Sequence, residues 1–213
     1  ASALVRGRTA LGALALVGAL ACGESGLASL VLWGGVAAAD PGISRARARR
    51  AWALALVVLV GWGVLYGLGG YGAHGSGMYL DPRDAPLRFL AAAPGRALAS
   101  CGALLVGVPA DLWTIPGAWM GSVGAGALGL VGLAGLLGVS RGALSRRDLR
   151  ALALFGGVGA CAILPILASV PMNRLLLLPS LGGAVAVATV SVASWRSGRR
   201  VLAMVLLLPH GLC

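Results

Sequence analysis

The arginines of this chain fall between long apolar runs, and their positions constrain the fold more than any other feature. The chain has 17 basic residues, all of them arginine, and 59% of its residues are hydrophobic. Because short arginine-rich loops stay in the cytoplasm, the pattern predicts an all-α, polytopic transmembrane helical bundle. Thirteen of the arginines form four clusters: Arg6 and Arg8; Arg45, Arg47, Arg49 and Arg50; Arg141, Arg146, Arg147 and Arg150; Arg196, Arg199 and Arg200.

The net charge of +11 is therefore a signal of membrane topology. Nucleic-acid binding would need these residues on one folded basic face, and their dispersal between apolar runs argues against that. Membrane lipid is the expected partner. The abundance of Ala, Gly, Leu and Arg, with no Lys, indicates a GC-rich bacterial genome and predicts a multi-pass protein of the bacterial inner (plasma) membrane. We expect residues 1–213 to form a single membrane-embedded domain that is a fragment of a longer chain.

The first apolar stretch, Leu11 to Ala38, has arginines on both flanks. Its roughly 28 residues exceed one untilted span across a core of about 30 Å, yet they are too few for two full spans. We therefore predict a hairpin of two short helices whose tip is Cys22–Gly26, with both of its ends facing the cytoplasm. Glycines permit the turn at that tip.

Four further apolar runs are long enough to cross the bilayer, and a truncated run, Val201 to Leu208, follows them. If the four full spans alternate in direction, every arginine cluster from Arg45 onwards lies on the cytoplasmic side. The glycine-rich third span should lie buried among other helices, because small residues let neighbouring helices approach closely. The full spans are Ala51–Gly69, Ala118–Val139, Ala151–Val170 and Leu175–Trp195.

The segment 71–116 is predicted to be a non-cytoplasmic loop with short amphipathic helices. Pro86 suits the first position of a helix, with Asp84 as its cap. Pro94-Gly95 should interrupt that helix, giving two short amphipathic or re-entrant helices at the outer surface. The run from Ala97 to Val108 is too short to cross the bilayer, but it can dip into it where protein lines it.

Two charged residues outside the clusters are candidates for substrate binding. Glu24 is the only glutamate of the chain and lies between apolar runs, where an ionised carboxylate costs at least about 2.5 kcal/mol. The alternative is a carboxylate at the hairpin tip, bonded to backbone amides. Arg174 is isolated on the outer side, against the positive-inside trend, and an anion would favour it there. The alternative is an arginine whose side chain reaches the membrane surface.

The outer loop supplies the other candidates. His74, Tyr79 and Asp81, together with Asp84 and Asp111, have the donors for a substrate or a divalent cation, since hard cations take carboxylate oxygens. Their spacing matches no metal motif, and turn formation and helix capping are the alternative explanation. The cysteines occur singly in apolar surroundings and are expected to be packing residues.

Three short segments resemble a known family. The sequence RLLLLPSLG from Arg174 to Gly182 resembles the motif ER-L-x-Y-L-P-S-x-G of the O-mannosyltransferase-like proteins that accompany tetratricopeptide repeats. GESGL from Gly23 resembles their S-K-E-x-G step between two short helices, and GYGAHGSGMYLDPRDAPLRFL resembles their outer loop in GC-rich bacteria. The family's lysine, acid and tyrosine are here Gly23, Asn173 and Leu177.

This resemblance implies a GT-C glycosyltransferase, a multi-span enzyme that uses a polyprenyl-phosphate-linked sugar at the outer membrane face, with a protein as one candidate acceptor. By resemblance Arg174 contacts the lipid phosphate and Glu24 helps to organise the membrane half of the site. The family's catalytic acid lies in a loop expected upstream of Ala1, so the fragment should be catalytically incomplete. The alternatives are a transporter or permease fragment, or a structural membrane subunit.

Overall fold

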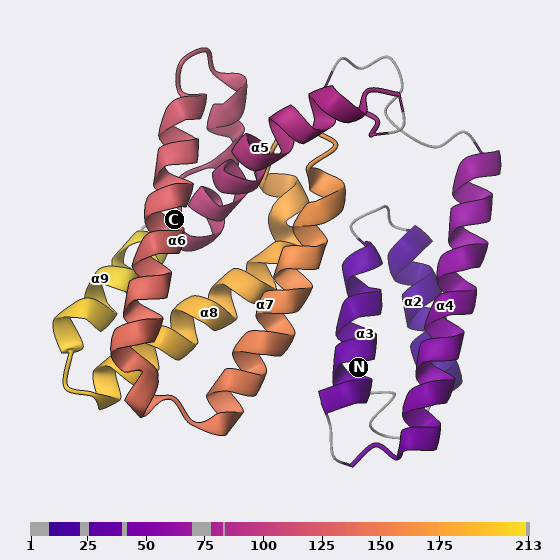
Figure 1. Cartoon of the computed structure of the whole chain (residues 1–213), viewed down its shortest axis with the longest axis horizontal. Coiled ribbons are helices and arrows are strands. Elements are labelled where there is room, and N and C mark those ends of the chain that lie inside the picture. Colours follow the sequence, from indigo (N-terminus) through magenta and orange to yellow (C-terminus); the bar gives the residue numbers. More distant parts are fainter. Residues whose placement is uncertain (1–8, 22–25, 40–41, 70–77, 83, 212–213) are drawn as a thin grey trace. The chain divides into compact units, whose positions relative to one another are not determined.

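The chain is a multi-pass membrane protein built from helices. The computed structural model describes residues 9–21, 26–39, 42–69, 78–82 and 84–211, and within these ranges the only strand-like pairing is one isolated bridge. Five helices are long and apolar enough to cross a membrane. The predicted all-α polytopic bundle is therefore confirmed (Figure 1). Two compact units make up the chain, residues 1–76 and 77–213, and each is described by itself. The prediction of a single membrane domain stays a prediction.

The predicted hairpin is present in unit 1. Helices α2 (Thr9–Ala21) and α3 (Leu27–Ala39) replace the single long apolar stretch, and both pack on α4 (Arg45–Leu68). The two short helices run antiparallel, because Gly12 lies against Trp33 while Gly26 lies against the backbone of Ala19. The predicted tip, including Glu24, falls outside the described residues except for Gly26.

Two tryptophans hold the hairpin against α4. The indole Nε1 of buried Trp33 donates to the carbonyl of Ala51 at 3.0 Å, and that of Trp62 donates to the carbonyl of Leu20 at 3.2 Å. The open end of the hairpin therefore lies beside the arginine-bearing start of α4, and its tip end lies beside the far half of α4. This arrangement places both hairpin flanks at the same end as Arg45, as the flanking arginines predicted.

Three predicted spans form the centre of unit 2. They are α6 (Trp119–Ser140), α7 (Arg146–Ile166) and α8 (Leu177–Arg196), and α9 (Arg200–Gly211) follows where the truncated run was expected. Helix α8 is the core element, with 44% of its central window buried. Its Gly182 meets α7 so closely that an added Cβ would lie 2.6 Å from the carbonyl oxygen of Phe155.

The expectation that α6 is buried among other helices is wrong. Only 11% of its central window is buried, and an added Cβ would meet nothing within 4 Å at five of its glycines: Gly121, Gly124, Gly132, Gly135 and Gly138. The close approach occurs instead at Gly126, whose added Cβ would lie 1.8 Å from the carbonyl oxygen of Leu98 on α5. One glycine of α6 therefore makes the tightest contact, while most of the others face away from the protein.

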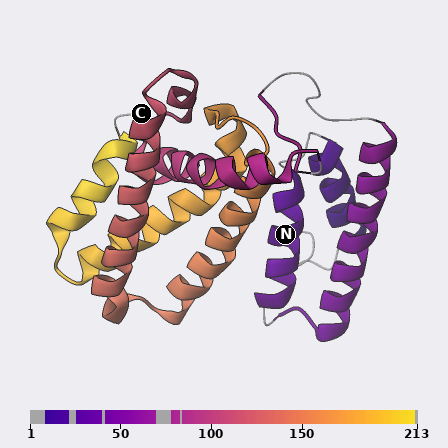
Figure 2. The same cartoon turned by 45° about the horizontal axis from the view of Figure 1, so that its top comes forward.

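The expected break at Pro94-Gly95 is also wrong, since α5 (Pro86–Val106) is one continuous helix with Pro94 inside it. Proline removes one backbone donor, and neighbouring helices in membrane proteins commonly compensate for that loss. Here α5 packs extensively on α6, running obliquely to it (Figure 2). Pro86 does begin the helix, but the N-cap residue is Ala85 and no side chain caps it, so the predicted cap by Asp84 is not formed.

Helix α5 enters and leaves unit 2 at the same end. Arg96, near its middle, donates to the carbonyl of Leu167, and Ala110, after its last turn, donates to the side chain of Asn173. Both partners belong to the connection between α7 and α8. The chain reverses at Gly107, whose φ of 78° lies in the left-handed region that glycine adopts readily. Residues 97–109 therefore leave that end and return to it, as the predicted dip requires.

This geometry preserves one side for the arginine clusters. If α5 crossed completely, the clusters at either end of α6 would be placed on the side opposite to that of Arg45, against the positive-inside trend. We expect single cysteines at Arg88, Asp111 and Asn173 to react with a membrane-impermeant maleimide from one side, and a cysteine at Ser145 from the other, in a chain whose native cysteines are replaced by alanine. Labelling of Arg88 and Asp111 positions from opposite sides would mean that α5 spans.

Candidate functional site

The polar contacts of unit 2 converge on the α7–α8 connection, residues 167–176, where α7 has ended and the short helix η4 (Asn173–Leu176) begins. Three separate segments bind it. The backbone N–H of Leu80 donates to the carbonyl of Ala168 at 2.7 Å, and Tyr79 forms an isolated antiparallel bridge with Ser169. Helix α5 and the turn that follows it supply the other two contacts. Figure 1 shows α5 passing beside this end of α7.

Arg96 is the most buried charged residue of the site. Its exposed fraction is 7%, and its Nη1 donates to the carbonyl of Leu167 at 2.7 Å. The partner is the first carbonyl past the end of α7, where the helix dipole favours a cation. The Nε atom of Arg96 is buried without a hydrogen-bond partner. A guanidinium group with an unused donor at the membrane surface is suited to holding an anion.

Asn173 fixes the turn after α5. Its Oδ1 accepts from the backbone N–H of Ala110 at 2.8 Å, which anchors the short helix η2 (Ala110–Thr114). The family motif has an acid at this position, and an amide oxygen can accept the same bond. The departure at Asn173 therefore preserves a structural contact while it removes a charge. Arg174, the next residue, is exposed.

An aromatic pair marks the level of this end in the membrane. The rings of Trp113 and Trp119 lie with their centroids 5.8 Å apart, and Trp113 also lies over Gly95 of α5. Tryptophan is enriched where the bilayer meets water. The pair is consistent with an interfacial depth for the α7–α8 connection.

The predicted site residues are brought together only in part. Tyr79 and Asp81 are half-buried, and the segment that carries them pairs with the α7–α8 connection, to which Arg174 also belongs. Asp111 is exposed in the first turn of η2. Glu24 and His74 lie outside the described residues. Among the residues that the structure describes, no group of three His, Cys, Asp or Glu side chains is placed to hold a metal ion.

Sequence reasoning missed Arg96 and the role of Asn173. Arg96 stands alone in the apolar run after Gly95, and a charge inside an apolar helix is expensive enough to indicate a function. The supposed helix break at Pro94 placed Arg96 in a surface loop, so this signal was not used. The motif glycine Gly182 has a physical reason as well, namely the close contact of α8 with α7.

Comparison with protein-family models, with curated proteins and with solved structures finds no match to this chain. The resemblance to the GT-C family therefore rests on the three short segments of sequence alone.

Proposed function

We propose that this chain is part of a GT-C-like glycosyltransferase of the bacterial inner membrane, which transfers a sugar from a polyprenyl-phosphate carrier to an acceptor outside the cytoplasm. One observation carries the proposal: the α7–α8 connection gathers Arg96, Arg174, Tyr79 and Asp81 at the end of unit 2 remote from the arginine clusters. Such a site combines cationic donors for a phosphate with a carboxylate and a phenol for sugar hydroxyls.

Each residue has a role that its environment supports. Arg174 is exposed at the start of η4, and its planar fork of donors matches the oxygens of a phosphodiester. Arg96 holds the connection through the carbonyl of Leu167 and adds positive charge beneath it. Asp81, half-buried beside this connection, is the described carboxylate best placed to bind sugar hydroxyls or a divalent cation. The roles of Glu24 and His74 rest on sequence resemblance.

Arg174→Ala is expected to weaken binding of a short-chain polyprenyl-phosphate hexose by about tenfold or more, because a charged hydrogen bond to phosphate contributes about 1.5 to 3 kcal/mol. Arg174→Lys should restore part of that affinity, since a point charge lacks the bidentate fork. Equilibrium binding of the labelled lipid to the purified chain in neutral detergent measures both variants.

Two controls make the measurement specific. The unphosphorylated polyprenol should bind the parent chain and both Arg174 variants with equal, weak affinity. Arg88→Ala removes a different exposed arginine from the first turn of α5, and donor affinity should then change less than threefold. A parent chain that prefers the polyprenol, or an alanine variant with unchanged affinity for the phosphorylated donor, would contradict the assignment of Arg174.

A further inference from the structure

The opposite end of unit 2 concentrates positive charge from two clusters that are distant in the sequence. We call it the arginine-rich end, and it comprises residues 139–150 and 194–200. Seven exposed arginines belong to it, and the only described acid there is Asp148, so its formal charge is seven minus one, or +6. The seven are Arg141, Arg146, Arg147, Arg150, Arg196, Arg199 and Arg200.

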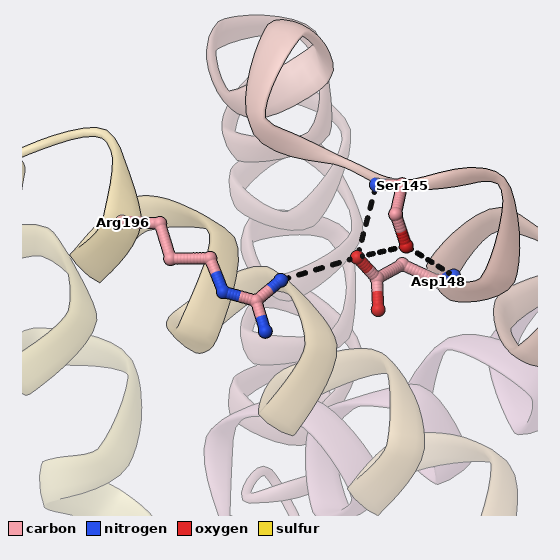
Figure 3. A network of polar contacts seen from close by, with 3 residues as sticks. All are labelled: Ser145, Asp148 and Arg196. Carbon is pink, nitrogen blue, oxygen red and sulfur yellow. Dashed lines mark hydrogen bonds and ion pairs between the residues drawn. The ribbon is translucent and has the colours of Figure 1, made fainter.

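Three contacts join the two clusters into one surface. Arg196 forms an ion pair with Asp148, with 3.5 Å between Nη1 and Oδ2 (Figure 3). Arg199 donates to the carbonyl of Val139 at the end of α6. Beneath them, the buried hydroxyls of Ser140 and Ser194 lie 3.0 Å apart. The charges of α7 and of the α8–α9 turn are therefore held beside one another by the fold.

The single acid neutralises little of this charge. Oδ2 of Asp148 accepts from the backbone N–H and the hydroxyl of Ser145, at 3.0 and 2.8 Å, in addition to the pair with Arg196. Arg146, Arg147 and Arg150 have no printed-out partner of opposite charge among the described residues within ion-pair distance. They also lie in the first turns of α7, at the positive end of its dipole, where cations are disfavoured.

An exposed tryptophan indicates how deep these arginines lie. Trp195 is 51% exposed, and the Cζ atom of Arg200 lies 5.4 Å from the centroid of its ring. Exposed tryptophans at the ends of spanning helices sit at the level of lipid headgroups. The guanidinium groups around Trp195 are therefore at the depth of lipid phosphates.

We propose that the arginine-rich end is a binding surface for the headgroups of anionic phospholipids, with Arg146, Arg147 and Arg150 as the main ligands of the phosphodiester and Arg199 and Arg200 flanking them. An anion here offsets both the uncompensated charge and the unfavourable position of cations at the start of α7. Basic surfaces between helix ends on the cytoplasmic side are suited to such headgroups. This inference is independent of the function proposed for the α7–α8 connection.

The test is binding of a fluorescent short-chain phosphatidylglycerol to the full chain in neutral detergent micelles, which impose no membrane sidedness. We expect saturable binding that weakens between about 0.05 and 0.5 M salt, as charges are screened, and no comparable binding of the phosphatidylcholine analogue. The triple variant R146Q/R147Q/R150Q should bind about tenfold or more weakly.

The matched control is R45Q/R49Q/R50Q, which removes the same charge from the first turn of α4 in unit 1 and should retain the parent affinity within about threefold. Equal loss in both triple variants would mean diffuse surface charge and would overturn the proposal, as would binding that is indifferent to salt. If the unit 2 glutamine variant fails to fold, R146K/R147K/R150K is used. It should bind severalfold more weakly because it lacks the guanidinium forks, and unchanged affinity would remove these residues as ligands.

Discussion

Replacing Gly126 by alanine is expected to lower the stability of unit 2 by about 3 kcal/mol, or to prevent its assembly, because one methyl group overfills the contact between α5 and α6. The new Cβ would lie 1.8 Å from the carbonyl oxygen of Leu98 and 2.5 Å from its carbonyl carbon. Backbone atoms cannot rotate away as a side chain can, so the two helices must separate. Thermal unfolding of the purified chain in detergent measures the loss.

Gly132→Ala is the matched control on the same helix. An added Cβ there meets nothing within 4 Å, and alanine has the higher helix propensity, so stability should change by less than about 1 kcal/mol. If Gly126→Ala proves as stable as Gly132→Ala, the crossing of α5 over α6 at Leu98 is not the packing that the protein uses.

Arg96→Glu is expected to cost about 4 kcal/mol, because it replaces a buried cation by a buried anion that faces the carbonyl of Leu167 with no donor in reach. Arg96→Met keeps much of the length of the side chain and removes both the charge and the hydrogen bond. Its loss should be no more than about 1.5 kcal/mol, since the desolvated Nε disappears with the bond.

Thermal unfolding of the two Arg96 variants in the same detergent distinguishes these effects. A glutamate variant as stable as the methionine variant would show that the side chain of residue 96 does not lie against the end of α7. Donor binding gives a second measurement: if Arg96 contributes its charge to the proposed phosphate site, the methionine variant should bind the polyprenyl-phosphate hexose several times more weakly although it remains folded.

The elements that sequence reasoning located correctly depend on local composition. The spans α4, α6, α7 and α8 follow from apolar runs of bilayer length, and the α2–α3 hairpin follows from a run that is too long for one span and too short for two. Both features are properties of contiguous residues and of the hydrocarbon thickness. The arginine clusters likewise indicated which helix ends belong together, and the ion pair between Arg196 and Asp148 joins two of them.

The candidate site depended on local signals that were ambiguous. Arg174 was recognisable because it is an isolated arginine at the start of a motif, and Tyr79 and Asp81 because they lie in a polar loop. Arg96 was hidden because Pro94 is read as a helix breaker, and this reading holds in water but not beside other membrane helices, which compensate for the lost hydrogen bond. Whether the site binds a lipid-linked sugar is a question for the binding measurements proposed above.

By itself, then, the sequence determined the helical class, the membrane-spanning elements and the hairpin, because hydrophobic length and charge placement act through neighbouring residues. Only the tertiary structure decided that Gly126 is the glycine at the α5–α6 crossing, that residues 97–109 leave and return to one end, and that Arg96 and Asn173 hold the connection between α7 and α8. These contacts join residues tens of positions apart. Their existence depends on which faces of the helices meet, and no local pattern of α5 or α6 specifies that.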